Sequence, residues 1–176
     1  MKLLITGAGG FLGKGLISAL EKHHVLRLMD IAPFETPHEK VIGSVADPEC
    51  VRRAVEGMEG IVIAHMAPNR PEIYADPAVP FDVNVKGTAN LFAAVVEHRC
   101  CQRIVLISST SVVGGAQRNG EFLTNETIPQ PTTLYALTKA CQESIAQFYS
   151  RAHGVSVVVL RPAYVIDADT LVDKYG

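Results

Sequence analysis

The segment 3–13, with the sequence LLITGAGGFLG, limits what this chain can fold into more than any other stretch. Its apolar start predicts a buried strand, and a helical pattern follows the glycines to about Lys22. Gly7, Gly10 and Gly13 lie three residues apart between these two elements. A strand, a glycine turn and a helix in this order form an anion site, because glycine lets the backbone approach a pyrophosphate and the helix N-terminus offers free N–H groups. A tight strand–helix turn that binds no ligand is the alternative interpretation.

A second strand, predicted over residues 24–30, ends in the acidic residue Asp30. Asp30 lies a little over twenty residues beyond Gly7, where a carboxylate accepts hydrogen bonds from the adenosine ribose of a bound dinucleotide. The same charge would repel a 2′-phosphate, so Asp30 favours NAD over NADP. As an alternative, an acid at the end of a strand can simply start a turn.

The rest of the chain continues to alternate between strand and helix patterns. Further strands are predicted at residues 41–43, 61–64, 103–107 and 155–160. Further helices are predicted at residues 48–58, 81–100 and 135–153, and loops at 31–40, 68–80 and 114–133. This order predicts an α/β fold of the Rossmann type. We expect a doubly wound parallel sheet of about six or seven strands, with helices on both faces and ligands at the carboxyl ends of the strands.

The composition fits one domain over residues 1–176, because 48% of the 176 residues are hydrophobic and can fill a single core. The net charge is −2 and no basic block is present, so we expect neither nucleic acid nor a membrane surface as a partner. The chain enters its first strand at once and has no apolar run long enough to span a bilayer, which favours a cytoplasmic protein.

Four cysteines lie in or beside the helical patterns, at Cys50, Cys100, Cys101 and Cys141. Their spacing matches neither a C-x-x-C redox pair nor a zinc site, and no His/Asn constellation accompanies them. We therefore expect reduced, buried or half-buried thiols and no metal site.

Tyr135 and Lys139 lie four residues apart at the start of the last predicted helix and therefore share one face of it. A tyrosine ordinarily titrates at about 10. A nearby ammonium group and the positive nicotinamide of an oxidised cofactor would lower the pKa of the Tyr135 phenol, which can then exchange a proton with a carbinol near neutral pH. Ser109, in the hydroxyl cluster 108–111, can hold the substrate oxygen. An ordinary surface pair is the alternative interpretation of Tyr135 and Lys139.

Two more residues near the expected crevice bear on how it is packed. His65 follows the strand 61–64, but a lone histidine is more often structural than catalytic. Gly87 interrupts the helix predicted at 81–100, where glycine costs stability, so we expect another segment to pack closely against it.

Six motifs together resemble the extended short-chain dehydrogenase/reductase family, in its NAD-dependent epimerase/dehydratase group. They are TGAGGFLG (residues 6–13), Asp30, NVKGTANL (84–91), SSTSVVG (108–114), YALTK (135–139) and LRPAYV (160–165), which cover nearly the whole chain in the right order. The resemblance implies a Rossmann fold with bound NAD and a catalytic set of Ser109, Tyr135 and Lys139. Ser109 is assigned by counting back from Gly114, and Thr110 is its nearest rival.

The resemblance also implies which residues lie along the cofactor. Asn84 matches the family's helix asparagine, which supports the site through a backbone or water contact, and residues 65–67 match its HLAA segment. The cofactor contacts expected are Gly7, Gly9, Gly10, Phe11, Leu12, Asp30, Ile31, Ser44, Val45, His65, Met66, Ala67, Asn84, Ser108, Tyr135, Lys139 and Pro162. Family members often pair through two long helices, here near residues 81–99 and 134–152, so we expect a homodimer.

Three positions differ from the family pattern. Ser44 stands where the family commonly has an aspartate near the adenine, so its hydrogen bond would be weaker. Val113 replaces the tyrosine before Gly114, and no asparagine follows the sixth strand near Tyr164, which disfavours a UDP-sugar substrate. The segment LRLMDI (26–31) is similar to uronate dehydrogenases, which oxidise a free sugar acid.

Length is the largest difference. The family usually continues past the sixth strand into a mostly helical substrate-binding portion, whereas this sequence stops at Gly176, and residues 167–176 are too short to form that portion. We expect either a partial chain or a second chain that completes the site. We also expect NAD binding with weak or absent turnover.

The resemblance therefore predicts an NAD-dependent oxidoreductase, epimerase or dehydratase that acts on a sugar, a sugar acid or a nucleotide sugar by hydride transfer. A non-catalytic NAD-binding sensor or scaffold module on the same fold is the alternative, because fold alone does not fix function. Retention of Tyr135 and Lys139 favours the enzyme. Asp30 disfavours a third class, the NADP-linked regulators.

Overall fold

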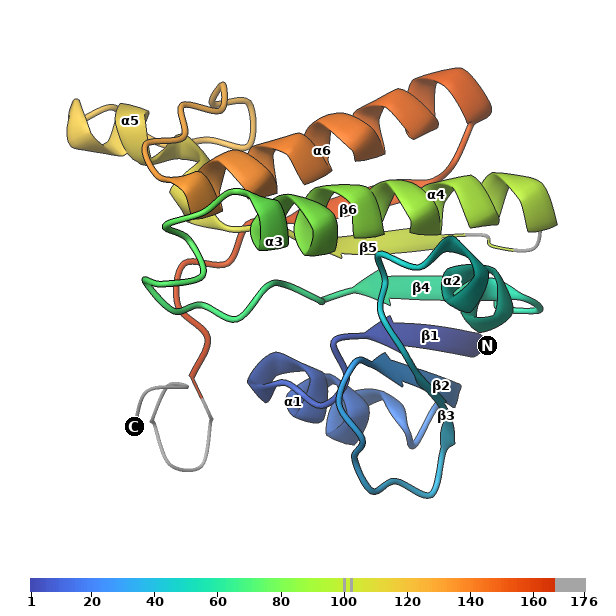
Figure 1. Ribbon diagram of the computed structural model, residues 1–176. Helices are drawn as coiled ribbons and strands as arrows, with labels where there is room; N and C mark the ends of the chain where they lie inside the picture. The colour runs from blue at the N-terminus through green and yellow to red at the C-terminus, as the bar shows by residue number, and fades with distance from the viewer. Residues whose placement is uncertain (100, 102, 167–176) are drawn as a thin grey trace.

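A six-stranded sheet forms the centre of the protein, and every strand pair in it is parallel (Figure 1). The computed structural model describes residues 1–99, 101 and 103–166. The strands are β1 Lys2–Thr6, β2 Val25–Asp30, β3 Glu39–Ile42, β4 Gly60–Ile63, β5 Arg103–Ile107 and β6 Val157–Leu160. Their order is β3-β2-β1-β4-β5-β6. The chain winds outward from β1 in one direction and from β4 in the other, which confirms the doubly wound Rossmann-type sheet.

Helices cover both faces of this sheet. The helices of the chain that the structure describes are α1 Phe11–Leu20, α2 Pro48–Val55, α3 Ala78–Pro80, α4 Gly87–His98, α5 Gly114–Arg118 and α6 Leu134–His153. Helix α1 packs on one face, while α2, α4 and α6 pack on the other (Figure 1). The crossovers between successive parallel strands place the helices on the faces in this way.

The alternation of side chains along β1 explains the two cores. Leu4 points to the face covered by α2, α4 and α6, where it shares a core with Phe92. Leu3 and Ile5 point to the other face, where Leu16 and neighbouring residues of α1 pack against them. Burial of each large apolar side chain contributes about 1.5–3 kcal/mol. Both cores therefore hold the carboxyl ends of the strands in a fixed arrangement.

The helix predicted at residues 81–100 begins earlier and ends earlier than expected. One helical segment runs from α3 through the π-helical Phe81–Lys86 into α4. Pro80 does not prevent this start, because proline is tolerated in a first helical turn. The segment ends where Arg99 takes a left-handed φ of 52°. A Cβ on Gly87 would lie 2.5 Å from Val45 Cγ2, so the expected close packing is confirmed.

The loop predicted at residues 114–133 contains helical turns at its start, so that prediction was wrong for its first residues. A 3₁₀ helix, Thr110–Val113, leads directly into α5. Ser109 caps it by accepting a hydrogen bond from the N–H of Ser111. The two glycines that open α5 concealed the helix in the sequence. Helix α2 also ends three residues early, because Glu56 leaves the helical conformation.

The described cysteines are buried or half-buried, as expected. Cys50 is buried, and Cys101 and Cys141 are half-buried. Burial raises the pKa of the Cys50 and Cys141 thiols, which disfavours the reactive thiolate. Cys100 and the segment 167–176 lie outside the described residues. Within the described part of the chain, no helix combines the length and the apolar character needed to cross a membrane.

Candidate functional site

The turn between β1 and α1 is built so that only glycine fits its key positions. Gly7 has φ +71°, and a Cβ there would lie 2.8 Å from the Cα of His65. A Cβ on Gly13 would lie 2.3 Å from the Gly7 carbonyl oxygen. The N–H of Gly10 donates to that same oxygen at 3.1 Å. Helix α1 therefore starts in direct contact with the end of β1, and no side chain caps its first turn.

Asp30 lies at the end of β2 and is tied to the glycine turn. Its Oδ2 accepts a hydrogen bond from the N–H of Gly9 at 2.9 Å, and its Oδ1 accepts one from the N–H of Ala32 at 3.2 Å. The second bond forms the local turn that the sequence offered as an alternative role. The first bond fixes the carboxylate beside the glycines, where a dinucleotide's ribose would lie.

A cavity of about 410 Å³ opens at the carboxyl ends of β1, β4, β5 and β6. Its volume is in the range of small-molecule sites. Ten residues expected at the site line it: Gly7, Gly10, Phe11, Leu12, Met66, Ser108, Ser109, Tyr135, Lys139 and Pro162. Further lining residues are Gly13, Ala64, Asn69, Ile107, Ser111, Ala163, Tyr164 and Val165. The glycine turn and the Tyr135–Lys139 face of α6 thus meet at one cavity.

The other expected cofactor residues do not line this cavity. They are Gly9, Asp30, Ile31, Ser44, Val45, His65, Ala67 and Asn84. Gly9 and Asp30 bond to each other beside the glycine turn, and Ile31 is exposed after β2. The Ser44 hydroxyl accepts a hydrogen bond from the N–H of Ala46, and Val45 is buried against Gly87. His65, Ala67 and Asn84 are buried.

Tyr135 and Lys139 are placed by the first turns of α6. Thr133 caps this helix by accepting a hydrogen bond from the N–H of Ala136. Lys139 is 3% exposed, and its Nζ donates to the Ile107 carbonyl oxygen at 2.9 Å. The rings of Tyr74 and Tyr135 pack nearly perpendicular to each other, with ring centroids 5.7 Å apart. The lysine ammonium is therefore held at the end of β5, and Tyr135 is supported by a second aromatic ring.

Asn84 joins the segment after β4 to helix α6. Its Oδ1 accepts a hydrogen bond from the N–H of Ala67 at 2.7 Å. Its Nδ2 donates to Thr138 Oγ1 at 2.9 Å and to the Tyr74 hydroxyl at 3.3 Å. Thr138 in turn donates to the carbonyl oxygen of Tyr135. The side chain of Asn84 thus connects three segments that surround the site.

The hydroxyl cluster after β5 places Ser109 and Ser111 in the cavity wall, whereas Thr110 does not line it. Ser109 Oγ donates to Ser111 Oγ at 3.0 Å and accepts from the N–H of Ser111 at 3.1 Å. This favours Ser109 over Thr110 as the hydroxyl that faces a ligand. Sequence reasoning did not single out Ser111, although it belongs to the hydroxyl cluster 108–111.

His65 is fully buried behind the glycine turn. Its Nδ1 forms a hydrogen bond with Thr6 Oγ1 at 2.9 Å. Burial, with a smaller contribution from the positive charge of Lys139, lowers the pKa of His65 to about 3, and the nearby Val83 carbonyl offsets only part of these effects. The imidazole is therefore neutral at physiological pH, which suits a packing role rather than proton exchange.

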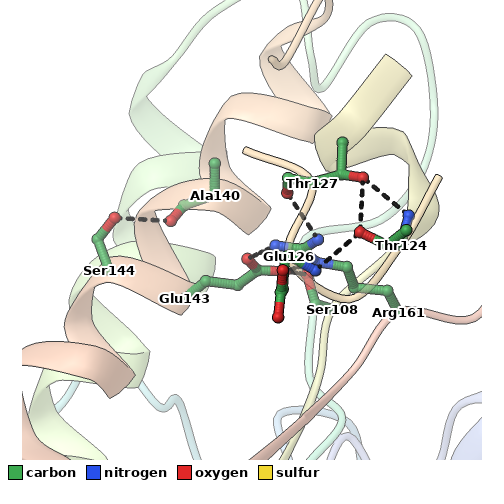
Figure 2. Close-up of polar contacts among 8 residues, drawn as sticks. All are labelled: Ser108, Thr124, Glu126, Thr127, Ala140, Glu143, Ser144 and Arg161. Atoms are coloured by element: carbon green, nitrogen blue, oxygen red, sulfur yellow. Dashed lines mark hydrogen bonds and ion pairs between the residues drawn. The ribbon is translucent and has the colours of Figure 1, made fainter. Parts of the chain in front are cut away.

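Ser108 also has a partner that the sequence did not reveal. Its Oγ donates to Oε1 of Glu143, a buried carboxylate on α6 that pairs with Arg161 after β6 (Figure 2). Glu143 lies four residues beyond Lys139, on the same helix face. That spacing was the available signal, but its partners lie far away in the sequence.

Comparison with known proteins gives a consistent picture. Residues 3–168 match the model of the NAD dependent epimerase/dehydratase family. The uronate dehydrogenase of Pseudomonas syringae pv. tomato is 33% identical over 168 residues, which are 91% of this chain and 58% of the relative. The GDP-6-deoxy-D-talose 4-dehydrogenase of Aggregatibacter actinomycetemcomitans is 30% identical over 166 residues, 94% of this chain and 53% of the relative.

Solved structures agree with the sequence relatives. A short-chain dehydrogenase/reductase superfamily protein from Agrobacterium tumefaciens with bound NAD superposes with a TM-score of 0.81 and 30% identity, over 92% of this chain and 48% of that chain. The UDP-glucose 4-epimerase of Thermus thermophilus in complex with NAD gives a TM-score of 0.82 at 24% identity, over 92% and 54%, and so shows the fold alone. The chain spans about half the length of the proteins that it matches.

Proposed function

Because this chain belongs to the NAD-dependent epimerase/dehydratase family, we propose that it binds NAD and carries the proton-exchange machinery for oxidising a carbinol of a sugar-type substrate. One observation carries the proposal: a single cavity brings together the glycine turn and the face of α6 with Tyr135 and Lys139. In a doubly wound sheet, ligands bind at the carboxyl ends of the strands where the strand order reverses. Here that point lies between β1 and β4.

The residues around this point fit NAD. A Cβ on Gly7 or Gly13 would collide with neighbouring backbone, so glycine at these positions lets the turn pack closely and leaves the N-terminus of α1 at the cavity, where it can bind a pyrophosphate. Asp30 is held by Gly9 next to the turn and offers a carboxylate to ribose hydroxyls. The same negative charge would repel the 2′-phosphate of NADP. These features support NAD as the cofactor, and competition between NAD and NADP tests the assignment, since a preference for NADP would contradict it.

The roles proposed for the catalytic residues follow from their places in the cavity. NAD, when bound, supplies a nicotinamide ring that accepts or returns a hydride. Tyr135 exchanges the proton of the substrate carbinol, and the Lys139 ammonium, held at Ile107, stabilises the phenolate. Ser109 holds the substrate oxygen by a hydrogen bond. Thr110 is set aside because it does not line the cavity.

A sugar acid is the substrate class that we favour. Two uronate dehydrogenases are each 33% identical to the chain over 91% of its length. Relatives that act on nucleotide sugars are also similar, among them a GDP-6-deoxy-D-mannose reductase from Pseudomonas aeruginosa at 29% identity. Since the chain spans only 58–59% of the two uronate dehydrogenases, oxidation by these 176 residues alone is expected to be weak or absent.

The test begins with the intact mass and bound-ligand content of the purified protein, followed by calorimetric titration with NAD. We expect saturable NAD binding, and absence of binding to a folded chain would refute the proposal. Tyr135→Phe should leave NAD binding intact while it abolishes any NADH formation with a uronic acid. Tyr149→Phe is the matched control, because Tyr149 lies on the same helix and stacks on Phe92 in the core. Turnover unaffected by Tyr135→Phe would contradict the role proposed for Tyr135.

We also propose that two copies pair through α4 and α6 in the cytoplasm. On α6, Leu137 and Phe148 are 40% and 56% exposed, and their spacing of about three helical turns places them on one face of the helix, which a second copy would cover. Light scattering of the purified chain should give the mass of a dimer, and Phe148→Glu should reduce it to that of a monomer. A monomer mass for the unaltered chain would refute this pairing.

A further inference from the structure

Glu143 is a buried charge one helical turn beyond Lys139, and its carboxylate is completely engaged. Its side chain is 3% exposed. Arg161 donates from Nε to Oε1 at 3.0 Å and from Nη2 to Oε2 at 2.8 Å, and Ser108 Oγ donates to Oε1 at 2.5 Å (Figure 2). The three residues come from α6, from the end of β6 and from the end of β5. The cluster therefore joins all three elements next to the cavity.

Two neighbouring hydrogen bonds hold α6 to the end of β5. Lys139 Nζ donates to the carbonyl oxygen of Ile107, and one turn later Glu143 accepts from the hydroxyl of Ser108. Ile107 and Ser108 are consecutive, so both hydrogen bonds hold the same short segment of backbone. The N–H of Ser108 also donates to the Leu160 carbonyl of β6 at 2.7 Å. The position of the Ile107 carbonyl thus depends on the hydrogen bonds that Ser108 makes to Leu160 and Glu143.

Arg161 extends the cluster to the loop before α6. Its Nη1 donates to the backbone oxygen of Thr127 at 3.3 Å, and Figure 2 shows the guanidinium between this loop and Glu143. The hydrogen bonds from Arg161 to Glu143 raise the pKa of the guanidinium, so Arg161 stays charged. A buried ion pair adds little net stability, because desolvation offsets the attraction. Its directional bonds can nevertheless select one arrangement of the elements that it joins.

We propose that Glu143 is a positioning residue, which with Arg161 and Ser108 fixes the Ile107 carbonyl and thereby the ammonium group of Lys139. The inference rests on the proposed function, in which Lys139 acts on Tyr135. Lysine carries its charge on a flexible four-carbon stem, so an anchoring hydrogen bond decides where that charge lies. Without the hydrogen bond from Ser108 to Glu143, the Ile107 carbonyl is held less firmly, through the bond of the Ser108 N–H to Leu160, and the anchor of Lys139 weakens.

The decisive variant is the double substitution Glu143→Leu/Arg161→Met. It removes both charges at once, so the net charge near the site is unchanged, and apolar replacement of a buried ion pair often preserves the fold. The control is Glu49→Gln/Arg52→Gln, which removes an exposed ion pair on α2. Ser108→Ala is a milder second variant that leaves the ion pair in place. It keeps the test open if the double variant does not fold.

Two NMR readouts follow the anchor itself. The first is solvent exchange of the Lys139 ammonium protons in ¹⁵N-labelled protein, with the signal assigned by Lys139→Met. The second is the titration midpoint of Tyr135 in protein with ¹³Cζ-labelled tyrosine, with the signal assigned by Tyr135→Phe. Both are measured without NAD and with it, and NAD affinity is measured in parallel. Neither readout requires turnover.

We expect the double variant to exchange its Lys139 ammonium protons at least about tenfold faster, as fits the loss of a buried hydrogen bond. Its Tyr135 midpoint should rise by at least half of the rise caused by Lys139→Met. Ser108→Ala should change both in the same direction by less, and the α2 control should change neither. Unaltered exchange of Lys139 in a folded double variant, or in Ser108→Ala, would overturn the inference. A Tyr135 midpoint unaffected by Lys139→Met would instead count against the proposed function.

Discussion

Two alanine substitutions in the same helix should have opposite effects on stability. Gly13 and Gly15 both lie in α1, two residues apart. A Cβ on Gly13 would lie 2.3 Å from the Gly7 oxygen and 2.6 Å from the Ala8 oxygen, whereas a Cβ on Gly15 would meet no atom within 4 Å. Both changes give the same gain in helix propensity. Their difference therefore isolates the contact between α1 and the glycine turn.

The magnitudes follow from these distances. For Gly15→Ala we expect a gain of about 0.5–1 kcal/mol, because alanine loses less conformational entropy in a helix. For Gly13→Ala, the clash is with backbone, which cannot rotate away, so α1 must move outward. Overpacking of this kind costs about 1–3 kcal/mol. The two variants should differ by about 2–12 °C in Tm, since they differ by this overpacking cost and a domain of this size shifts by about 2–4 °C per kcal/mol.

Thermal unfolding followed by circular dichroism measures this difference, and calorimetric titration with NAD measures its consequence for the site. Gly13→Ala should also weaken NAD binding, because the displaced helix no longer presents its N-terminus at the right distance. Gly15→Ala should leave NAD binding unchanged. If Gly13→Ala were as stable as Gly15→Ala, the reasoning from close backbone contact would be wrong.

Three further outcomes are expected. Asn84→Leu should lower the free energy of unfolding by roughly 3 kcal/mol, measured by urea unfolding, because it leaves the buried N–H of Ala67 without its acceptor. Asn90→Leu is the control and should lower the free energy of unfolding by less. Because the pKa of His65 is depressed in the fold, this histidine binds a proton at higher pH in the unfolded chain than in the folded one. The free energy of unfolding should therefore fall by up to about 1.4 kcal/mol per pH unit as the pH is lowered from 6.5 towards 3. The variant His65→Asn should remove this contribution to the slope. Asp30→Asn should reduce the preference for NAD over NADP in competition binding, and an unchanged preference would contradict the role of Asp30.

The sequence was sufficient for the elements whose signals are local. The glycine spacing after β1 identified the turn, and a run of apolar residues identified each central strand. The signal was weaker where tertiary packing decided the structure. Residues 78–80 became helical despite Pro80, because the helix could extend into positions where a proline nitrogen needs no partner. The 3₁₀ helix Thr110–Val113 depends on a single capping hydroxyl, Ser109, which composition does not reveal.

In the candidate site, too, residues with local sequence signals could be predicted, whereas those that depend on tertiary packing could not. Gly7, Ser109, Tyr135 and Lys139 could be placed at one cavity from motif spacing, and the structure brings them together there. The Glu143–Arg161 pair could not be foreseen, since its partners belong to different elements and nothing local couples them. Hydrogen bonds between distant segments depend on register, which only the folded sheet determines.

The strand order itself explains why the site forms where it does. Between β1 and β4 the chain reverses its direction of winding, so the loops that leave these two strands turn to opposite faces and open a crevice. A Cβ on Gly7 would lie 2.8 Å from the Cα of His65 after β4, so only glycine lets the two loops pack this closely. Strand β5 then adds Ser108 and Ser109 to the same edge, and α6 returns over it with Lys139. Residues more than a hundred positions apart are thus brought to one edge by topology, and the glycine turn provides the space between them.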